Sequence, residues 1–255
     1  MTGLSLARIF TILPLAFWIW AVHMISYHAV SFGFELCDRH GLMKRFKLRA
    51  VDRLSHGDML PRVVFNQTFI LLPAMLLCQY AGLAYVGTAH LSAWMFIGGI
   101  LAMTLGHDIV QYAGHRWLLH HPRLRWLGHG LHHTTGASKA ISAVYMRSGD
   151  FFFNIVCPYL VPLIVIGGGG SDILFHVTIM GLGVVGGVYE HSGYDFGGVR
   201  DSGTWTGRVL RLLPASFISS HAHGQHHRRS SVSFSDGFGS PGLCDLVFGT
   251  RWDRR

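Results

Sequence analysis

Histidine is the residue whose number and spacing are most unusual in this chain. Eighteen of the 255 residues are histidine, and most of these fall in the windows 107–133 and 191–227. Residues three and four positions apart share one face of a helix, so one helical turn can aim several of them at one metal ion. Neutral imidazole suits zinc, copper, iron and nickel, and does not suit calcium or magnesium. Each window contains one His-x-x-His-His motif, formed by His129, His132 and His133 and by His223, His226 and His227.

Other groups able to do chemistry stand close to the first window. On a regular helix Asp108, Tyr112 and His115 share one face, and we take Asp108 and Tyr112 as candidate catalytic residues. Carboxylates hydrogen-bonded to metal-bound imidazoles fix their tautomers. Each carboxylate could instead cap a helix or carry a solvated charge. The candidates for the tautomer-fixing role, with Asp108 favoured, are Asp108, Glu190, Asp195 and Asp245.

The elements that must position these residues are apolar helices. Charged residues make up only 13% of the chain, whereas soluble domains contain about 25%. A helix needs about 20 apolar residues to span a bilayer, and the chain has several uncharged stretches near or above that length. We therefore predict an all-α, multi-pass membrane bundle of about four to five spans, at 9–33, 63–86, 91–113, 151–168 and 172–190.

The basic residues predict which membrane face carries the histidines. All lysines and arginines except Arg8 fall in segments 35–62, 114–150 and 192–255, and the turns 87–90 and 167–172 contain none. Lysine and arginine collect in the cytoplasmic loops of membrane proteins. Five spans then place both windows on the cytoplasmic face, as a histidine-rich helical cap. The net charge of +8 suits contact with anionic membrane lipids and requires no nucleic acid.

The remaining features favour one domain over residues 1–255. No repeat or low-complexity linker divides the chain, and the N-terminus is expected to be a retained span rather than a cleaved signal peptide. The four cysteines form no Cys-x-x-Cys pair, so we expect neither a disulfide nor a thiolate metal site. Five isolated histidines are interpreted as interfacial side chains without a special role, namely His23, His28, His40, His56 and His90.

Several separate motifs occur in a characteristic order. Asp108, Tyr112, His115 and Arg116 precede His120, and the first His-x-x-His-His motif follows. Then come HSGYDF at 191–196, the second His-x-x-His-His motif and DLVFGT at 245–250. Over a motif core of about 107–250 this series resembles the fatty acid hydroxylase/sterol desaturase superfamily. The HSGYDF segment is most similar to C4-methylsterol oxidases and cholesterol 25-hydroxylase-like proteins.

The resemblance implies a dinuclear centre of two iron ions in the cap. It also implies O2, a hydrophobic lipid-like substrate, and a separate electron donor of the ferredoxin or cytochrome b5 type with its reductase. Zinc is expected as a substitute in purified protein, because imidazole sites bind zinc at least as well as iron. The expected location is the bacterial inner membrane or the endoplasmic reticulum. The implied metal ligands are His115, His120, His129, His132, His133, His191, His223, His226 and His227.

The chain also departs from the usual family pattern. His115 and His120 are separated by four residues instead of three, which places them about 140° apart on a regular helix. A local unwinding or a π-bulge is therefore expected to aim both inward. The late motif has Asp236 where an Asn is usual and Cys244 where a Trp is usual. Two further histidines, His107 and His221, are candidates for additional ligands.

Three function classes follow from this pattern. The first is hydroxylation of a C–H bond of a lipid, sterol or other hydrophobic molecule. The second is desaturation at the same centre, which product mass would distinguish as a loss of two hydrogens instead of a gain of one oxygen. The third is a non-enzymatic metal-binding or transport protein. That class would place polar residues along a path inside the spans, whereas the dense histidine clusters lie outside the predicted spans.

Overall fold

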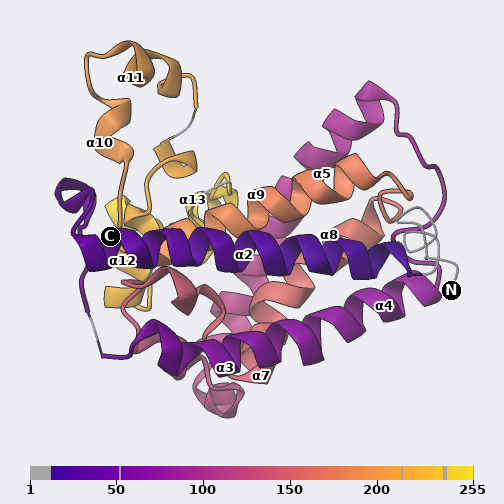
Figure 1. Cartoon of the computed structure of the whole chain (residues 1–255), viewed down its shortest axis with the longest axis horizontal. Helices are drawn as coiled ribbons and strands as arrows, with labels where there is room; N and C mark the ends of the chain where they lie inside the picture. The colour runs from indigo at the N-terminus through magenta and orange to yellow at the C-terminus, as the bar shows by residue number, and fades with distance from the viewer. Residues whose placement is uncertain (1–12, 52, 214, 238–239, 255) are drawn as a thin grey trace, which may run out of the picture.

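The computed structural model of the chain describes residues 13–51, 53–213, 215–237 and 240–254 (Figure 1). These residues form helices and connecting segments without a β-strand, and one isolated antiparallel bridge joins Lys47 to Tyr194. The predicted all-α class is therefore confirmed. Arg8 and the predicted start of the first span at residue 9 lie outside the described residues.

Five helices of the described chain are long and apolar enough to cross a membrane. Figure 1 shows α2 running along the length of a bundle, with α9 beside it. Three of the five contain a π-helical turn between or after their α-helical parts. The five long helices are α2 (Leu15–His40), α3 (His56–Asn66) with Gln67–Leu71 and α4 (Leu72–Tyr80), α5 (Ala93–Tyr112) with Ala113–Leu119, α7 (Ser148–Phe151) with Phe152–Val156 and α8 (Cys157–Val165), and α9 (Ile173–His191).

The prediction of five apolar helices is confirmed, but several bounds are wrong. The first helix ends at His40 instead of 33, and the third ends at Leu119 instead of 113. The second helix was expected over 63–86 and occupies His56–Tyr80. It begins earlier because Ser55 and Asp58 form a capping box: the Ser55 side chain accepts from the Asp58 backbone and the Asp58 side chain accepts from the Ser55 backbone. Such a box satisfies two otherwise unpaired N–H groups at a helix start. The uncharged stretch thus marks the apolar part of this helix and not its beginning.

Apolar side chains cover both the inside and the outside of the bundle. The inside includes Ile19, Met75 and Phe175, all fully buried. The outer surface is apolar too, since Leu77 and Trp94 are 70% and 85% exposed. Large exposed apolar surfaces on a folded protein mark interaction sites, including contact with a membrane. The exposed apolar helix faces fit a lipid surround.

The two turns that contain no basic residue pack against each other at one end of the bundle. The Ser171 backbone N–H donates to the Thr88 carbonyl at 2.9 Å, and the Tyr85 N–H donates to the Gly168 carbonyl at 3.2 Å. Gly168 has a φ of +78°, and a Cβ there would lie 2.5 Å from the Leu83 carbonyl oxygen. Only glycine fits such a close approach in the left-handed region.

Short helices close the other end of the bundle and form the cap. The histidine motifs lie on α6 (His129–His133) and α12 (His221–Arg228), and Lys47 ties the cap together by donating to Asp38 and to the carbonyls of Ser138 and Ser192. In Figure 1, α10 and α11 project sideways from this end. The other short elements are α10 (Gly197–Arg200), α11 (Trp205–Leu210), α13 (Leu243–Val247) and the 3₁₀ turns Lys44–Phe46, Pro122–Leu127, Ala140–Val144, Ala215–Phe217 and Trp252–Arg254.

The interpretation of two isolated histidines as interfacial side chains is wrong. His23 is buried within α2, and its Nε2 lies 3.1 Å from the Gln67 side-chain nitrogen. His28 Nε2 lies 2.9 Å from the Gln67 side-chain oxygen. Gln67 begins the π-helical turn of the second long helix. A polar group inside an apolar bundle needs hydrogen-bond partners, and these three side chains supply them to one another.

Candidate metal centre

All nine predicted ligands come together in the cap as two neighbouring groups. In each group one potential ligand atom per residue lies within 4.8 Å of every other. Both groups lie at the basic end of the bundle, where α5, α7 and α9 meet α6 and α12. The first group is His115, His120, His129, His133 and His226, and the second is His132, His191, His223 and His227.

A π-helical turn brings the irregularly spaced pair together. Residues Ala113–Leu119 continue α5 in π-helical form, and the His120 backbone N–H donates to the His115 carbonyl at 3.1 Å. This i to i+5 bond is the one that defines a π-helix. The two imidazole ring centroids are consequently 5.1 Å apart. The expected π-bulge is confirmed, and it places both rings in the first group.

The motif helix α6 divides its histidines between the two groups. His129 and His133 are four residues apart and join the first group, with their Nε2 atoms 2.9 Å apart. His132 points to the second group, where its Nε2 lies 3.0 Å from that of His191 at the end of α9. Spacing alone left open which neighbour accompanies His129, and the fold selects His133.

Helix α12 also divides its motif histidines between the two groups, but here the pair four residues apart joins the second group. His223 and His227 join the second group with Nε2 atoms 3.1 Å apart, and His226 joins the first. The groups adjoin because His133 and His227 stack with ring centroids 4.6 Å apart. Two His-x-x-His-His motifs on separate helices thus build two adjacent sets of imidazoles, each drawing on both motifs.

Backbone carbonyls fix the tautomers of three of these rings. Nδ1 of His115 lies 2.8 Å from the Phe234 carbonyl, that of His226 lies 2.7 Å from the Val232 carbonyl, and that of His191 lies 2.8 Å from the Gly187 carbonyl. A carbonyl only accepts, so each Nδ1 carries the hydrogen and each neutral ring presents a lone pair at Nε2. Those lone pairs face the two groups.

A carboxylate that the sequence analysis missed orients a fourth ring. Asp150 Oδ1 lies 2.9 Å from His129 Nδ1, and Asp150 is fully buried. The Asp150 oxygen accepts the hydrogen bond from Nδ1, which leaves the lone pair of His129 at Nε2. The sequence did contain a signal, because Asp150 is the only acidic residue between positions 109 and 171.

The facing lone pairs give a direct test of whether the residues fit a metal. His115 Nε2 and His129 Nε2 are 2.9 Å apart, and both rings carry their hydrogen on the opposite nitrogen. Two acceptors at this separation repel, since neither has a hydrogen to share. A cation within the first group turns this repulsion into coordination. In the second group His191 Nε2 also presents a lone pair, and it lies 2.9 Å from His223 Nε2 and 3.0 Å from His132 Nε2. Both donor sets therefore fit metal ions.

The cap also keeps its imidazoles uncharged. Burial, together with the charge of His133, lowers the pKa of His120 to about 4, and burial lowers the pKa of His133 to about 4. Burial and neighbouring histidines lower the pKa of His223 and of His227 well below the ordinary range. Neutral imidazole is the form that ligates metals. The rings are therefore in the ligating form at neutral pH.

The two candidate catalytic residues lie outside both groups. Asp108 accepts hydrogen bonds from the Ser240 hydroxyl and from the backbone N–H groups of Leu243 and Cys244. It thus caps the start of α13. Helix capping is the alternative role that the sequence left open for this carboxylate. The Tyr112 ring stacks on Phe248, with centroids 5.1 Å apart. Neither side chain hydrogen-bonds to a histidine of the two groups.

Two further candidate carboxylates, those of Asp245 and Asp195, also act away from the imidazoles. Asp245 accepts from the backbone N–H groups of Phe234, Ser235 and Asp236, and from the Thr250 hydroxyl. It thereby holds the loop whose Phe234 carbonyl orients His115. Asp195 accepts from the hydroxyls of two serines, Ser219 and Ser220, and the Glu190 backbone carbonyl accepts from Arg49.

The two candidate additional ligands do not join either group. His107 is exposed on α5. His221 stacks on Trp252, with ring centroids 4.6 Å apart, and its Nε2 lies 3.0 Å from the Gln225 side-chain nitrogen. The donor set among the described residues therefore consists of the nine histidines of the two groups.

Comparison with known proteins agrees with this arrangement. The sequence model of the fatty acid hydroxylase family matches residues 100–250, which is more than half of the chain and includes all nine histidines. The chain is 25% identical over 200 residues to fatty acid hydroxylase ahd1 from Mycosarcoma maydis, a match that covers 76% of this chain and 45% of that protein. No solved structure matches significantly. The chain belongs to the fatty acid hydroxylase family.

Proposed function

We propose that the protein is an O2-dependent di-iron oxygenase of the membrane that hydroxylates a C–H bond of a lipid, sterol or other hydrophobic substrate. The observation that supports this most directly is the facing of imidazole lone pairs, with His115 and His129 Nε2 atoms 2.9 Å apart. Family membership supports a hydroxylase activity, and the two donor sets support two metal ions.

In this proposal the first group holds one ion and the second group holds the other. Two iron ions, when bound, supply with O2 an oxidant strong enough for an unactivated C–H bond, which no side chain supplies. The protein's own residues position the donors. Asp150 and the carbonyls of Phe234, Val232 and Gly187 keep the hydrogens on Nδ1, so that the lone pairs point inward.

The surroundings of the site support a membrane-derived substrate. The cap lies at one end of five apolar helices, and the basic segments of the chain meet at that end. By the positive-inside rule this end is cytoplasmic, in a bacterial inner membrane or the endoplasmic reticulum. There the site is accessible both to substrate from the bilayer and to a soluble or membrane-bound electron donor of the ferredoxin or cytochrome b5 type.

Mass spectrometry of lipid extracts tests the reaction. Cells that express the wild-type chain should contain a lipid that gains one oxygen atom, and cells that express His191→Ala should lack it. A product that has lost two hydrogens would identify a desaturase instead. Identical lipid profiles for the two strains, with both proteins inserted in the membrane and supplied with the donor system, would refute the oxygenase.

Metal analysis tests the centre independently of turnover. The purified wild-type chain should carry close to two metal ions, either iron or substituted zinc, because imidazole sites accept both. A folded protein without bound metal after reconstitution with ferrous iron or zinc would contradict the proposal.

A further inference from the structure

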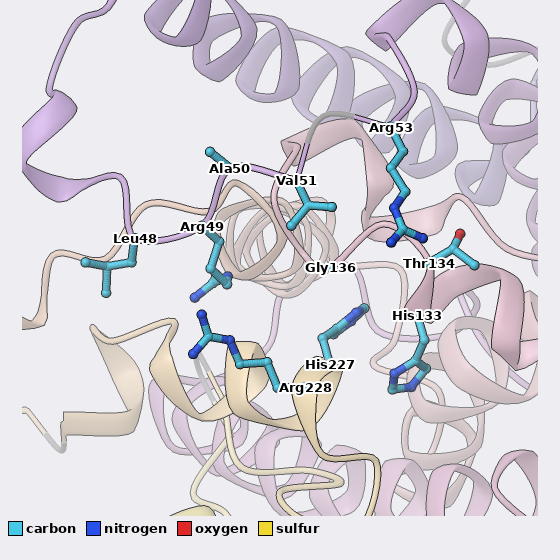
Figure 2. Close-up of a pocket in the computed structure, with 10 residues that line it drawn as sticks. All are labelled: Leu48, Arg49, Ala50, Val51, Arg53, His133, Thr134, Gly136, His227 and Arg228. Atoms are coloured by element: carbon cyan, nitrogen blue, oxygen red, sulfur yellow. The ribbon is translucent and has the colours of Figure 1, made fainter.

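A cavity of about 450 Å³ opens beside the two histidine groups. His133 of the first group and His227 of the second both line it, and segment 48–51 forms the facing wall. Figure 2 shows these two rings below that segment, with the side chains of Arg53 and Arg228 reaching into the space on either side of His227. The cavity thus reaches both groups.

One of the three arginines that line the cavity is part of the framework. Arg49 is buried and donates to the carbonyls of Ala137 and Glu190, at 3.0 and 2.8 Å, and to the Ser220 hydroxyl at 3.1 Å. These bonds join segment 48–51 to α9 and to the start of α12. The guanidinium of Arg49 is therefore occupied, and it adds fixed positive charge to the wall.

The side chains of the other two arginines have no hydrogen-bond or ion-pair partner among the residues that the structure describes. Arg53 and Arg228 are exposed residues whose side chains line the cavity. Within the described part of the chain, no carboxylate forms an ion pair with either of them. Burial lowers the pKa of Arg49, the nearby carboxylates of Asp195 and Glu190 raise it, and the charge of Arg228 lowers it. Arg228 therefore adds positive charge close to that of Arg49, and an anion bound in the cavity would relieve the repulsion between the two cations.

A second cavity continues the first toward the side of the bundle. It has a volume of about 230 Å³ and shares Val51, Arg53 and Thr134 with the first. Its lining includes Leu54 and Met59 at the start of the second long helix. The combined space therefore leads from the histidines, past Arg53, to the first turn of the second long helix.

We propose that this cavity binds the anionic headgroup, a carboxylate or a phosphate, of a lipid substrate, with Arg53 and Arg228 as its hydrogen-bond donors. Guanidinium groups bind both anions through paired, charge-assisted hydrogen bonds. The assignment of the ligand as substrate rests on the proposed oxygenase function. The two arginines thereby become specificity-determining residues, which select acidic lipids over neutral lipids such as sterols.

Direct binding to the zinc-loaded full chain tests this inference without turnover. The probes are tritiated palmitate and tritiated hexadecanol, which share a chain and differ in headgroup charge, measured as saturable binding in a scintillation proximity assay. Arg53→Gln and Arg228→Gln should each weaken palmitate binding about tenfold and leave the weaker hexadecanol binding unchanged. Arg125→Gln, at an exposed arginine outside the cavity, should bind both probes like the wild type.

Competition distinguishes the two sources of the anion. Hexadecyl phosphate that displaces palmitate at lower concentration than unlabelled palmitate indicates a phosphate headgroup, and the reverse order indicates a carboxylate. The inference is overturned if wild-type protein binds neither anion better than hexadecanol, or if the two cavity variants bind palmitate like Arg125→Gln. It is also overturned if they lose palmitate and hexadecanol equally. Because no turnover is measured, a failure of the oxygenase proposal appears separately, in the lipid extracts.

Discussion

At the scale of single residues, the site is organised by which nitrogen of each imidazole carries the hydrogen. Three rings donate from Nδ1 to backbone carbonyls and one donates to Asp150. These bonds lie outside the space that the rings surround, and they direct the lone pairs into it. The donor sets are thus oriented by the fold before any ion binds, which lowers the entropic cost of coordination.

The motif helix α12 offers a matched pair of substitutions. We predict that His223→Ala lowers bound metal by about one ion per chain and abolishes turnover, because an alanine methyl group cannot ligate. His221→Ala, on the same helix but outside both groups, should retain metal and activity. Elemental analysis of protein extracted from the membrane in folded form measures this. Equal metal content in the two variants would show that α12 is not part of a metal site.

A second pair of substitutions separates the roles of two buried aspartates. Asp150→Asn should weaken metal affinity by about 10- to 100-fold, the usual effect of losing a carboxylate that orients a ligating histidine. Asp108→Asn should lower the melting temperature instead, because Asp108 caps α13, and should leave metal affinity nearly unchanged. Metal titration and thermal unfolding measure the two effects. The same change in both variants would mean that Asp150 has no specific role at His129.

Because Asp236 is buried, we predict that the free energy of unfolding depends on pH. Burial raises the pKa of Asp236 from 3.8 to about 6, and Arg251 opposes this shift. The folded state therefore holds this proton more tightly than the unfolded state. That stabilisation is complete below pH 4 and is lost as the pH rises through 6. Asp236→Asn removes the buried charge and should stabilise the protein at pH 7.5, by about 3 kcal/mol at most.

The measurement for Asp236 is the melting temperature of wild type and variant at two pH values. The advantage of Asp236→Asn at pH 7.5 should shrink at pH 5, where the wild-type carboxyl is protonated. An advantage of equal size at both values would mean that packing, and not charge, separates the two side chains.

At the scale of elements, π-helical turns adjust the direction of side chains within the long helices. One such turn aims both His115 and His120 into the first group. It packs against another, since the Phe153 carbonyl oxygen of the turn Phe152–Val156 would lie 3.1 Å from a Cβ at Gly114. A third begins at Gln67, whose side chain meets His23 and His28. The first and third of these turns therefore lie at polar side chains that meet partners on other helices.

Changing the length of the first of these turns tests this account. Deleting Trp117, which is 51% exposed, leaves His115 and His120 four residues apart, and a regular helix then places both on one face. We expect this variant to keep its metal. Inserting an alanine after Trp117 separates the pair by about 240° on a regular helix and should lower bound metal. Loss of metal in the deletion variant and retention in the insertion variant would refute the role of the π-helical turn.

At the scale of the whole molecule, charge separates the two ends of the bundle. The cap contains the basic segments, whereas the opposite end consists of two packed turns without a basic residue. Because lysine and arginine collect in the cytoplasmic loops of membrane proteins, we propose from this asymmetry that the cap, with its cavity and its histidines, lies on the cytoplasmic side.

Cysteine accessibility in intact cells tests the orientation. In a background without the native cysteines, Ala89→Cys at the exposed turn of the opposite end should react with a membrane-impermeant maleimide. Arg125→Cys in the cap should react only after the cells are opened. Labelling of Arg125→Cys in intact cells, with protection of Ala89→Cys, would reverse the assigned orientation.

The sequence by itself determined the class of the fold and the membership of the site. Uncharged stretches revealed the five apolar helices, because a bilayer excludes charge over a fixed length. The two repeated motifs identified six of the nine clustered histidines, because helical periodicity puts residues three and four apart on one face. The resemblance to the family supplied the other three, His115, His120 and His191. The odd spacing of His115 and His120 even indicated a π-bulge, since a regular helix could not aim both rings inward.

Tertiary structure alone decided how those residues combine. Whether His132 or His133 joins His129 depends on where α9 and α12 lie, and no local period contains that information. The roles of Asp150 and Asp108 depended on contacts between distant segments, for example the 135 positions that separate Asp108 from Leu243. The cavity beside His133 and His227 likewise forms where three separate segments meet. Local sequence specifies which side chains a helix face presents, and the packing of helices decides what each of those side chains meets.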